Sequence, residues 1–464
     1  MKLFYFLLST VFICLNANAQ LNPKVLSSDQ VAKLRALGVQ AIQEVISDSD
    51  IDLSDSDEIK QYVSEILQTQ ISEETTPDAI SDITNVITSS ILAIAARDTT
   101  IDLPTVVEAT ASEATKTTIN TVANLDSDIN GDGVVDERDI QEMANAAASG
   151  ASSGALSVSS EANLDISEIV EAVASGSVSG TVEAAVEENL NVADMVETTS
   201  SGSTSGIIEV STSLANDING DGVVDEKDII TAIDASSAGA ISGAIESVNL
   251  AGDINNDGVV NELDVVSVLE STASGISAGA VQSTIEISGD INFDGVVDER
   301  DVATISETVA ASVTDNIVTA VVENSEAISD GESVISLDAQ TVLEDSANAV
   351  TESIIEVLVD DPDTSVEELS DIAISIVDIL TDIAEDNILS ADALSNIVEE
   401  VTENVESSVT EDVEVVEDIV TEDDAGEDEV TEDDAGEEVS GDEIPIVETP
   451  DDTLYDPSKF LLEP

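Results

Sequence analysis

Apolar residues recur at helical spacing along much of the chain. In the segment that follows Asp165, apolar side chains fall three or four residues apart, at Ile166, Ile169, Val170 and Val173. A helix would carry all four on one face. Asp165 itself has the side chain of a good N-cap. The segment therefore predicts an amphipathic helix that buries a single apolar stripe.

The same spacing predicts helices on both sides of this segment. Residues 20–125 contain the pattern of three or four amphipathic helices, which begin at residues 27–29, at Asp57, after Pro77 and after Pro104. Residues 302–405 keep the pattern, most clearly at 368–387. The chain is therefore expected to be mainly α.

Ser-Gly pairs add a second regularity. Glycines of the motif SG-x-x-SG and its relatives stand at intervals of 26, 26, 37 and 36 residues, at Gly154, Gly180, Gly206, Gly243 and Gly279. A unit of 26 residues fits one helix of about six turns and a tight turn. Glycine inside a helix costs about 1 kcal/mol relative to alanine, so either neighbouring helices approach closely there or each helix breaks in two. We expect close approach, in an array of antiparallel helices built from units of about 26 residues.

An acidic string of twelve residues occurs four times. It reads DINGDGVVDERD at 128–139 (loop 1), DINGDGVVDEKD at 217–228 (loop 2), DINNDGVVNELD at 253–264 (loop 3) and DINFDGVVDERD at 290–301 (loop 4). Each string fits the calcium loop of an EF-hand, whose ligands fall at positions 1, 3, 5, 7, 9 and 12. With the residue at position 7 giving its carbonyl oxygen, the predicted ligands are Asp128, Asn130, Asp132, Val134, Asp136 and Asp139; Asp217, Asn219, Asp221, Val223, Asp225 and Asp228; Asp253, Asn255, Asp257, Val259, Asn261 and Asp264; and Asp290, Asn292, Asp294, Val296, Asp298 and Asp301.

The spacing of these ligands follows from coordination chemistry. Ca²⁺ is a hard cation that takes six to eight oxygens, and alternate residues of a tight loop point their oxygens inward. Gly133 stands at position 6, where the chain turns sharply. Val135, at position 8, is expected to form a short strand contact with a partner loop, as are Val224, Val260 and Val297. Loop 3 brings three ligand carboxylates and the other loops four, so we expect about four bound Ca²⁺ ions. Simple up-down alternation of the helices would place loops 2 and 4 at one end of the array and loops 1 and 3 at the other.

These loops resemble those of the dockerin family. Aspartate stands at position 12 in all four, each loop is followed by a helical pattern, and a second loop follows about 36 residues on. Dockerins are paired calcium loop–helix modules that bind cohesin domains, so the resemblance implies a calcium module and a cohesin-type partner. Dockerins commonly recognise cohesin through small hydroxyl residues at positions 10 and 11. Here these positions hold Glu137-Arg138, Glu226-Lys227, Glu262-Leu263 and Glu299-Arg300. We therefore expect the calcium chemistry to carry over and not the partner.

The composition narrows the function classes. Eleven Lys+Arg against 101 Asp+Glu give a formal net charge of −90, which excludes nucleic acid and anionic membrane surfaces as partners. The chain has no His, and its single cysteine is Cys14. Since Ser-His and Cys-His nucleophiles need those residues, we expect no enzyme. The acidic composition would also suit a salt-loving source, which concerns environment and not function.

Residues 1–19 have the features of a secretory leader. Lys2 precedes an apolar run from Leu3 to Leu15, and Ala17-Asn18-Ala19 has the small-x-small form of a cleavage site. Cleavage after Ala19 would leave a secreted chain that contains no cysteine. No later segment is expected to cross a bilayer.

The remaining organisation follows from these features. We expect an N-terminal helical region at 20–125, a calcium-loop repeat region at 126–320, a C-terminal helical region at 321–405 and a disordered acidic tail at 406–464. The leading interpretation is a secreted or cell-surface structural protein whose array Ca²⁺ rigidifies, with a possible protein partner at the cell surface or in the extracellular matrix. The alternatives are a dockerin-like adaptor that binds a cohesin-type partner, and a matrix protein that binds mineral calcium through its acidic tail.

Overall fold

The computed structural model describes the helical part of the chain. It covers residues 51–125, 133–162, 164–214, 221–251, 262–287, 299–324 and 339–360 without gaps, together with shorter stretches between residues 26 and 379. All of these belong to the first of two units into which the chain divides, Met1–Val413. The second unit, Glu414–Pro464, lies outside the described residues, as do the predicted leader at 1–19 and the acidic tail at 406–464.

The described elements are almost all helices, as predicted. In chain order they are α3 (Val39–Ser47), α4 (Ser56–Gln70), α5 (Pro77–Ala95), α6 (Leu103–Val122), α7 (Glu137–Ala162), α8 (Ile166–Glu188), α9 (Val192–Leu214), α10 (Glu226–Ala251), α11 (Glu262–Ile287), α12 (Glu299–Asn324), β1 (Ile328–Ser329), β2 (Val334–Ile335) and α13 (Ala339–Asp360). The two strands form a short antiparallel ladder between α12 and α13.

Local sequence signals explain where the helices begin. Asp55 caps α4, and Thr76 caps α5, which begins at Pro77 as predicted. The side chain of Asp165 accepts the amide of Glu168 at the start of α8. The four residues of the predicted α8 stripe are all buried. Most of the predicted segment 368–387 lies outside the described residues.

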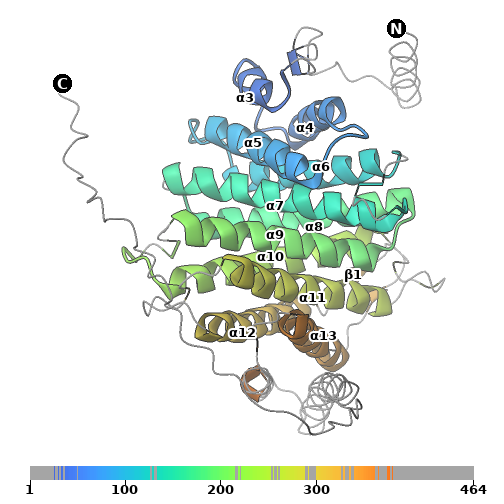
Figure 1. Ribbon diagram of the computed structural model, residues 1–464, viewed down its shortest axis with the longest axis vertical. Helices are drawn as coiled ribbons and strands as arrows, with labels where there is room; N and C mark the ends of the chain where they lie inside the picture. The colour runs from blue at the N-terminus through green and yellow to red at the C-terminus, as the bar shows by residue number, and fades with distance from the viewer. Residues whose placement is uncertain are drawn as a thin grey trace, which may run out of the picture. The chain divides into compact units, whose positions relative to one another are not determined.

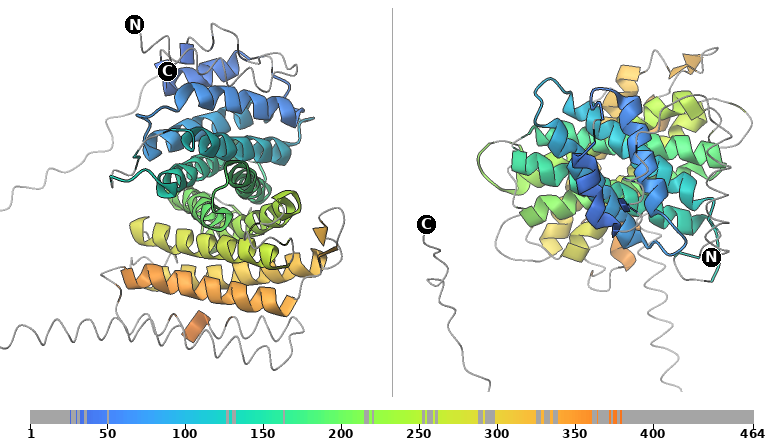
Figure 2. Two further views of the ribbon diagram at one scale, coloured as in Figure 1. Left: turned by 90° about the vertical axis from the view of Figure 1, so that its right-hand side faces the viewer. Right: turned by 90° about the horizontal axis from the view of Figure 1, so that it is seen from above.

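Two layers of helices make up the array. From α5 to α11, each helix packs most extensively on the helix two positions along the chain and less on its sequence neighbours. The helices α3, α5, α7, α9, α11 and α13 therefore form one layer, and α4, α6, α8, α10 and α12 the other. Figures 1 and 2 show the helices stacked in chain order from α3 to α13.

Contacts at the glycines give the direction of the helices within a layer. Gly176 and Gly180 of α8 lie against Glu108 and Ser112 of α6, in the same order along both helices. The same holds for α7 on α5, α9 on α7, α10 on α8 and α11 on α9, so helices of one layer are parallel. Consecutive helices are in different layers and run in opposite directions. Loops 1 and 3 thus lie on one edge of the array, and loops 2 and 4 on the other, as predicted.

The glycines allow the close approach expected from the sequence. A Cβ added to Gly180 would overlap the carbonyl oxygen of Ser112, and one added to Gly243 would overlap that of Ser175. The helices α7, α8, α10 and α11 run unbroken through their glycine pairs. Helix breaks are therefore ruled out there. The partner is the helix two along the chain, so the glycines set the spacing of helices within a layer.

This close packing ends at α12. Glycines stand 13 and 17 residues after the first residue of α10, at Gly239 and Gly243, and α11 has the same spacing. In α12 these places hold Ser312 and Asn316. The Asn316 side chain instead donates hydrogen bonds to the Asp234 carbonyl oxygen at 3.2 Å and to Ser237 Oγ at 2.7 Å. The pair α10–α12 accordingly packs less extensively than α8–α10.

Small hydroxyl side chains share the core with aliphatic ones. Ser152 and Ser203 join α7 to α9 through their hydroxyl groups at 2.8 Å, and Thr181 donates to Thr199 across the layers at 2.9 Å. These side chains are at most 1% exposed. Short side chains are needed near the glycines because the glycines bring the helix backbones close together. Tyr62, fully buried, donates its hydroxyl hydrogen to the Val45 carbonyl oxygen at 3.0 Å.

One lysine side chain links two helices of the same layer. Lys116 of α6 forms ion pairs with Glu183 at 3.0 Å and Glu187 at 2.8 Å on α8, so this basic residue of the N-terminal region joins neighbouring helices.

The expectation that no later segment could span a bilayer was too strict. By length and composition alone, both α5 and α8 are long and apolar enough to cross a membrane. In the structure α8 is a core helix, and 72% of its most apolar stretch of 18 residues is buried.

Candidate metal centre: the four acidic loops

One buried aspartate closes each of the four loops. The residue at position 12 is at most 2% exposed in every loop. Its Oδ1 accepts the backbone amide of the isoleucine at position 2, ten residues earlier. The N···O distances are 2.6 Å for Ile129 to Asp139, 2.6 Å for Ile218 to Asp228, 2.8 Å for Ile254 to Asp264 and 2.7 Å for Ile291 to Asp301. The four loops thus share one closure.

The same aspartate starts the helix that follows. In loop 2, Asp228 Oδ2 accepts the amide of Asp225 at 2.8 Å, and Asp225 Oδ1 accepts the amide of Lys227 at 3.0 Å. Loop 1 repeats this reciprocal pattern with Asp136 and Asp139. Such a capping box satisfies amides that the first helical turn leaves unpaired. The helix therefore begins at position 10 of each loop, at Glu137, Glu226, Glu262 and Glu299.

The turn in the middle of the loop depends on glycine. Gly133 and Gly222, both at position 6, have φ angles of 90° and 87°, which L side chains rarely adopt. A Cβ at either place would meet nothing within 4 Å. Glycine is therefore required there for its backbone conformation and not because space is short. The amide of Gly133 donates to Asp128 Oδ2 at 3.0 Å. The sharp turn predicted at position 6 is confirmed in loops 1 and 2.

The remaining polar groups of the described half-loops lie at the protein surface. Asp128, Asp136 and Asp221 are exposed. In loop 2, Asn219 Oδ1 accepts the amide of Asp221 at 2.9 Å, and Asp221 Oδ1 accepts that of Val223 at 2.8 Å. Surface carboxylate and amide oxygens beside a buried, hydrogen-bonded aspartate are the ligand types that a hard cation such as Ca²⁺ takes.

The structure describes half of the predicted ligands. Within the described residues, no group of three or more Asp or Glu side chains has metal-binding geometry. The metal centre therefore remains a prediction from spacing and loop closure. The predicted ligands outside the described residues are Asn130, Asp132, Asp217, Asp253, Asn255, Asp257, Asn261, Asp290, Asn292, Asp294, Val296 and Asp298.

The strand contact expected at position 8 is not formed in the described loops. Val135 is 54% exposed and Val224 is 37% exposed, and neither lies in a strand. Val260 and Val297 lie outside the described residues. For Val135 and Val224 the prediction was wrong. Consecutive loops lie on opposite edges of the array, because helices of up to 26 residues join them. Loops 1 and 3, which share one edge, are separated there by the corner between α8 and α9.

Sequence reasoning missed the isoleucine at position 2. Ile218, Ile254 and Ile291 are between 1% and 5% exposed, and their amides bind the buried aspartate. This side chain holds the start of the loop against the helical core. The signal was present, because all four loops begin Asp-Ile-Asn.

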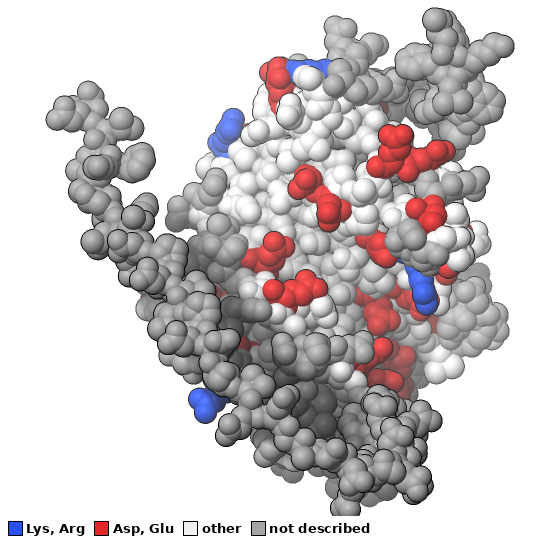
Figure 3. Space-filling model, in the orientation of Figure 1, with Lys and Arg blue, Asp and Glu red and all other residues white. Residues whose placement is uncertain are grey.

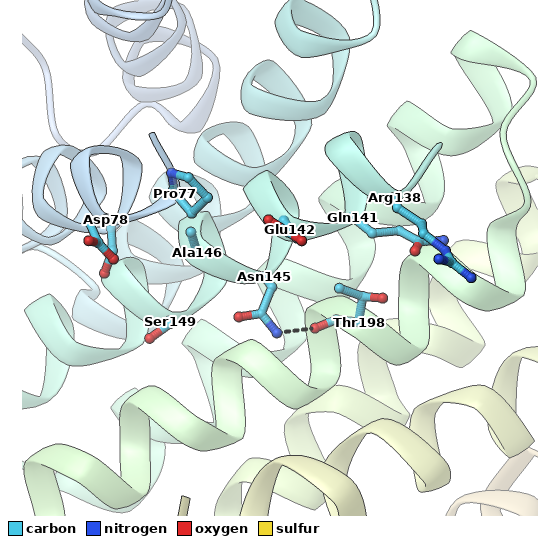
Figure 4. A pocket seen from close by; sticks show the side chains of 10 residues that line it. Pro77, Asp78, Arg138, Gln141, Glu142, Asn145, Ala146, Ser149 and Thr198 are labelled. Atoms are coloured by element: carbon cyan, nitrogen blue, oxygen red, sulfur yellow. Dashed lines mark hydrogen bonds between the residues drawn. The ribbon is translucent and has the colours of Figure 1, made fainter. Parts of the chain in front are cut away.

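A cavity of the described array lies beside loop 1. It has a volume of about 540 Å³ and lies between the start of α5, α7 and α9. Figure 4 shows Asp78 and Arg138 at its two ends, and Asn145 donating to the Thr198 carbonyl oxygen at 3.1 Å. Because that hydrogen bond holds the Asn145 amide against α9, the side chain serves helix packing.

Acidic side chains outnumber basic ones on the face drawn in Figure 3, where they form scattered patches. Burial raises the pKa of Glu113, although the hydroxyl of Thr117 donates to its carboxylate at 2.7 Å. Burial also raises the pKa of Glu270, with Asp345 as a second cause. The array thus holds carboxylates whose ionised form is disfavoured.

Comparison with known proteins gives one match. Residues 251–310 match the family described as the dockerin type I domain. This segment contains loops 3 and 4 and the whole of α11. A comparison with curated proteins finds no match to the chain. The dockerin-like, calcium-binding loop repeat suspected from the sequence is therefore confirmed for this segment, which is similar to a docking module and not to a catalytic domain.

Proposed function

We propose that the protein is a non-enzymatic calcium-binding repeat protein that acts outside the cell, and that Ca²⁺ in the four loops rigidifies its helical array. The observation that carries the proposal is the shared closure of the loops by a buried aspartate at position 12. Each closure joins the end of one long helix to the start of the next. An ion in the loop would therefore fix a corner of the array.

The charge of the chain gives calcium a physical role. A net charge of −90 opposes compaction through self-repulsion. Ions bound in the loops would reduce that repulsion where three or four carboxylates converge. A ligand that binds only the folded state also stabilises it by mass action. Extracellular calcium modules bind at about 10⁻⁴–10⁻³ M, which suits a permanent structural role.

Calorimetric titration of the metal-free full chain with Ca²⁺ tests this proposal. We expect uptake to end near four ions, and the variant Asp264→Asn to bind about one ion fewer. Asp165→Asn is the matched control, because Asp165 caps α8 at a corner that has no acidic loop. Uptake that continues far beyond four ions and ignores Asp264→Asn would contradict the proposal. That result would favour the matrix protein that binds calcium through its acidic tail.

The family match favours a second candidate function. A segment similar to a dockerin type I domain would act as an adaptor for a cohesin-type partner. In that segment positions 10 and 11 hold Glu262-Leu263 and Glu299-Arg300 in place of small hydroxyl residues. We therefore expect the full chain with Ca²⁺ to bind none of a panel of cohesin domains at micromolar concentration. Saturable binding that EDTA abolishes would establish the adaptor function instead.

A further inference from the structure

Helices of one layer meet backbone to backbone. A Cβ added to Gly202 of α9 would overlap the carbonyl oxygen of Asn145 on α7, and one added to Gly239 of α10 would overlap that of Glu171 on α8. These glycines stand in the interior of their helices, away from the corners. The spacing of helices within a layer is therefore fixed by contacts that do not involve the loops.

The acidic loops, in contrast, all join the two layers. Loop 1 connects α6 to α7, loop 2 connects α9 to α10, loop 3 connects α10 to α11 and loop 4 connects α11 to α12. In each case one helix belongs to one layer and the next helix to the other. Each loop also brings three or four predicted ligand carboxylates, whose mutual repulsion a bound cation would offset.

The two corners of α8 close without an acidic loop. Asp165 caps the first turn of this helix, and beyond its last turn the amide of Leu190 donates to the Ala185 carbonyl oxygen at 2.9 Å. The links to α7 and α9 are residues 163–165 and 189–191, which hold a single carboxylate, that of Asp165. The contacts of α8 with α7 and α9 should therefore be independent of calcium.

We propose that the four loops act as calcium-dependent clamps between the two layers. Loss of Ca²⁺ lets the layers splay apart at the corner α6–α7 and at the three corners from α9 to α12. The glycine contacts inside each layer and the contacts of α8 with α7 and α9 stay closed. This opening deepens the proposed calcium function and rests on it, because it names the place where the array yields when calcium leaves.

Three pairs of buried hydroxyl groups report on these contacts separately. The pairs are Thr204–Ser236 between α9 and α10, Thr181–Thr199 between α8 and α9, and Ser152–Ser203 between α7 and α9, with oxygen–oxygen distances of 3.2, 2.9 and 2.8 Å. The first crosses the layers at the corner of loop 2, the second crosses them at a corner without an acidic loop, and the third lies within a layer. All six side chains are at most 1% exposed. A cysteine at any of these places is protected unless its contact opens.

The rate at which single cysteines react with a thiol reagent tests the proposal. Every variant is the full chain with Cys14→Ser, so that the introduced cysteine is its one thiol. We expect Ser236→Cys to react about tenfold or more faster in EDTA than in millimolar Ca²⁺ at equal ionic strength. Thr199→Cys and Ser152→Cys are the matched controls, and their rates should be nearly the same in the two solutions.

Disulfides give a second test, because they close one contact covalently. Oxidised Thr204→Cys with Ser236→Cys should reduce the drop in melting midpoint that EDTA causes. Two control disulfides join contacts that stay closed, so they should leave that drop unchanged. They are Thr181→Cys with Thr199→Cys and Ser152→Cys with Ser203→Cys.

Calorimetry on the same samples separates the outcomes. Equal acceleration of labelling at all three positions in EDTA would show that the whole array unfolds, which would overturn the opening between layers and leave the calcium function intact. Unchanged labelling of Ser236→Cys in a chain that binds about four ions would also overturn the clamps alone. Absence of Ca²⁺ binding would overturn the calcium function itself, and the clamps with it.

Discussion

The carboxylate of Asp228 accepts the backbone amide of Ile218 at 2.6 Å, from a residue that lies ten positions earlier in the chain. Its second oxygen accepts the amide of Asp225 at 2.8 Å. The start of loop 2 and the start of α10 are therefore tied to one side chain, which is 2% exposed. Three further loops repeat the contact to the isoleucine, so the closure is a property of the repeat.

Asp228→Asn should destabilise the array even without calcium. An amide side chain has a single acceptor oxygen, so it cannot accept both the buried amide of Ile218 and the partly buried amide of Asp225 as the carboxylate does. We expect a loss of about 1–3 kcal/mol in the free energy of unfolding in EDTA, measured by urea denaturation. Asp55→Asn, at an exposed N-cap, should cost clearly less. Equal costs for the two variants would contradict the role assigned to the closure.

Gly180→Ala should separate α6 from α8. The added methyl group would overlap the Ser112 carbonyl oxygen, and backbone atoms cannot move aside cheaply. We expect a destabilisation of about 1–3 kcal/mol despite the better helix propensity of alanine. Thermal unfolding measures the loss. The neighbouring Ser179→Ala should be neutral or slightly stabilising, and a similar gain at both positions would argue against close approach.

Loop 3 should be the weakest calcium site. Asn261 stands at position 9, where the other loops have aspartate, so one ligand carboxylate is missing. Ligand charge is one determinant of calcium affinity, and Asn261→Asp should raise the affinity of this site roughly tenfold. Calorimetric titration at fixed ionic strength resolves the weakest step. If the weakest step does not move, loop 3 is not that site.

Mild acidification should stabilise the calcium-free array. Burial raises the pKa of Glu113 and Glu270, and it raises that of Glu108 together with the charge of Glu246. The folded state then binds more protons than the unfolded state above the ordinary glutamate pKa of about 4.3. The free energy of unfolding therefore falls as pH rises through the folded-state pKa, and it rises as pH is lowered.

Thermal melts in EDTA from neutral pH down to about pH 5 measure this dependence. The midpoint should rise as the pH falls. Glu113→Gln should reduce the slope, because it removes one of the responsible groups. Glu209→Gln, at an exposed position of α9, should leave the slope unchanged. A midpoint that falls steadily with acidification in EDTA would refute the prediction.

Local features of the sequence were sufficient to predict much of the array. The Asp165 cap and the stripe at Ile166 and Ile169 define α8, and Pro77 begins α5. The glycine interval gave the length of the repeat. Because strict alternation of direction follows from helices joined by short corners, the distribution of the four loops between two edges was also predictable.

Contacts between helices or loops that are distant in the sequence were not predictable. Glycine spacing does not reveal that Gly180 contacts α6 and not α7 or α9, because this depends on how the two layers form. Nor does a ligand pattern show whether two loops are adjacent, and Val135 was therefore assigned a strand contact that it does not form in the structure. The position-2 isoleucine could have been found from its recurrence, but its role requires the buried aspartate that binds its amide.

The most direct test of the central claim is thermal melting of the full chain, followed by far-UV circular dichroism in EDTA and in millimolar Ca²⁺ at the same ionic strength. If Ca²⁺ in the loops rigidifies the array, calcium should raise the melting midpoint and the helical signal, and NaCl of equal ionic strength should not. Identical melting and identical helix content in the two solutions would show that the loops do not support the array.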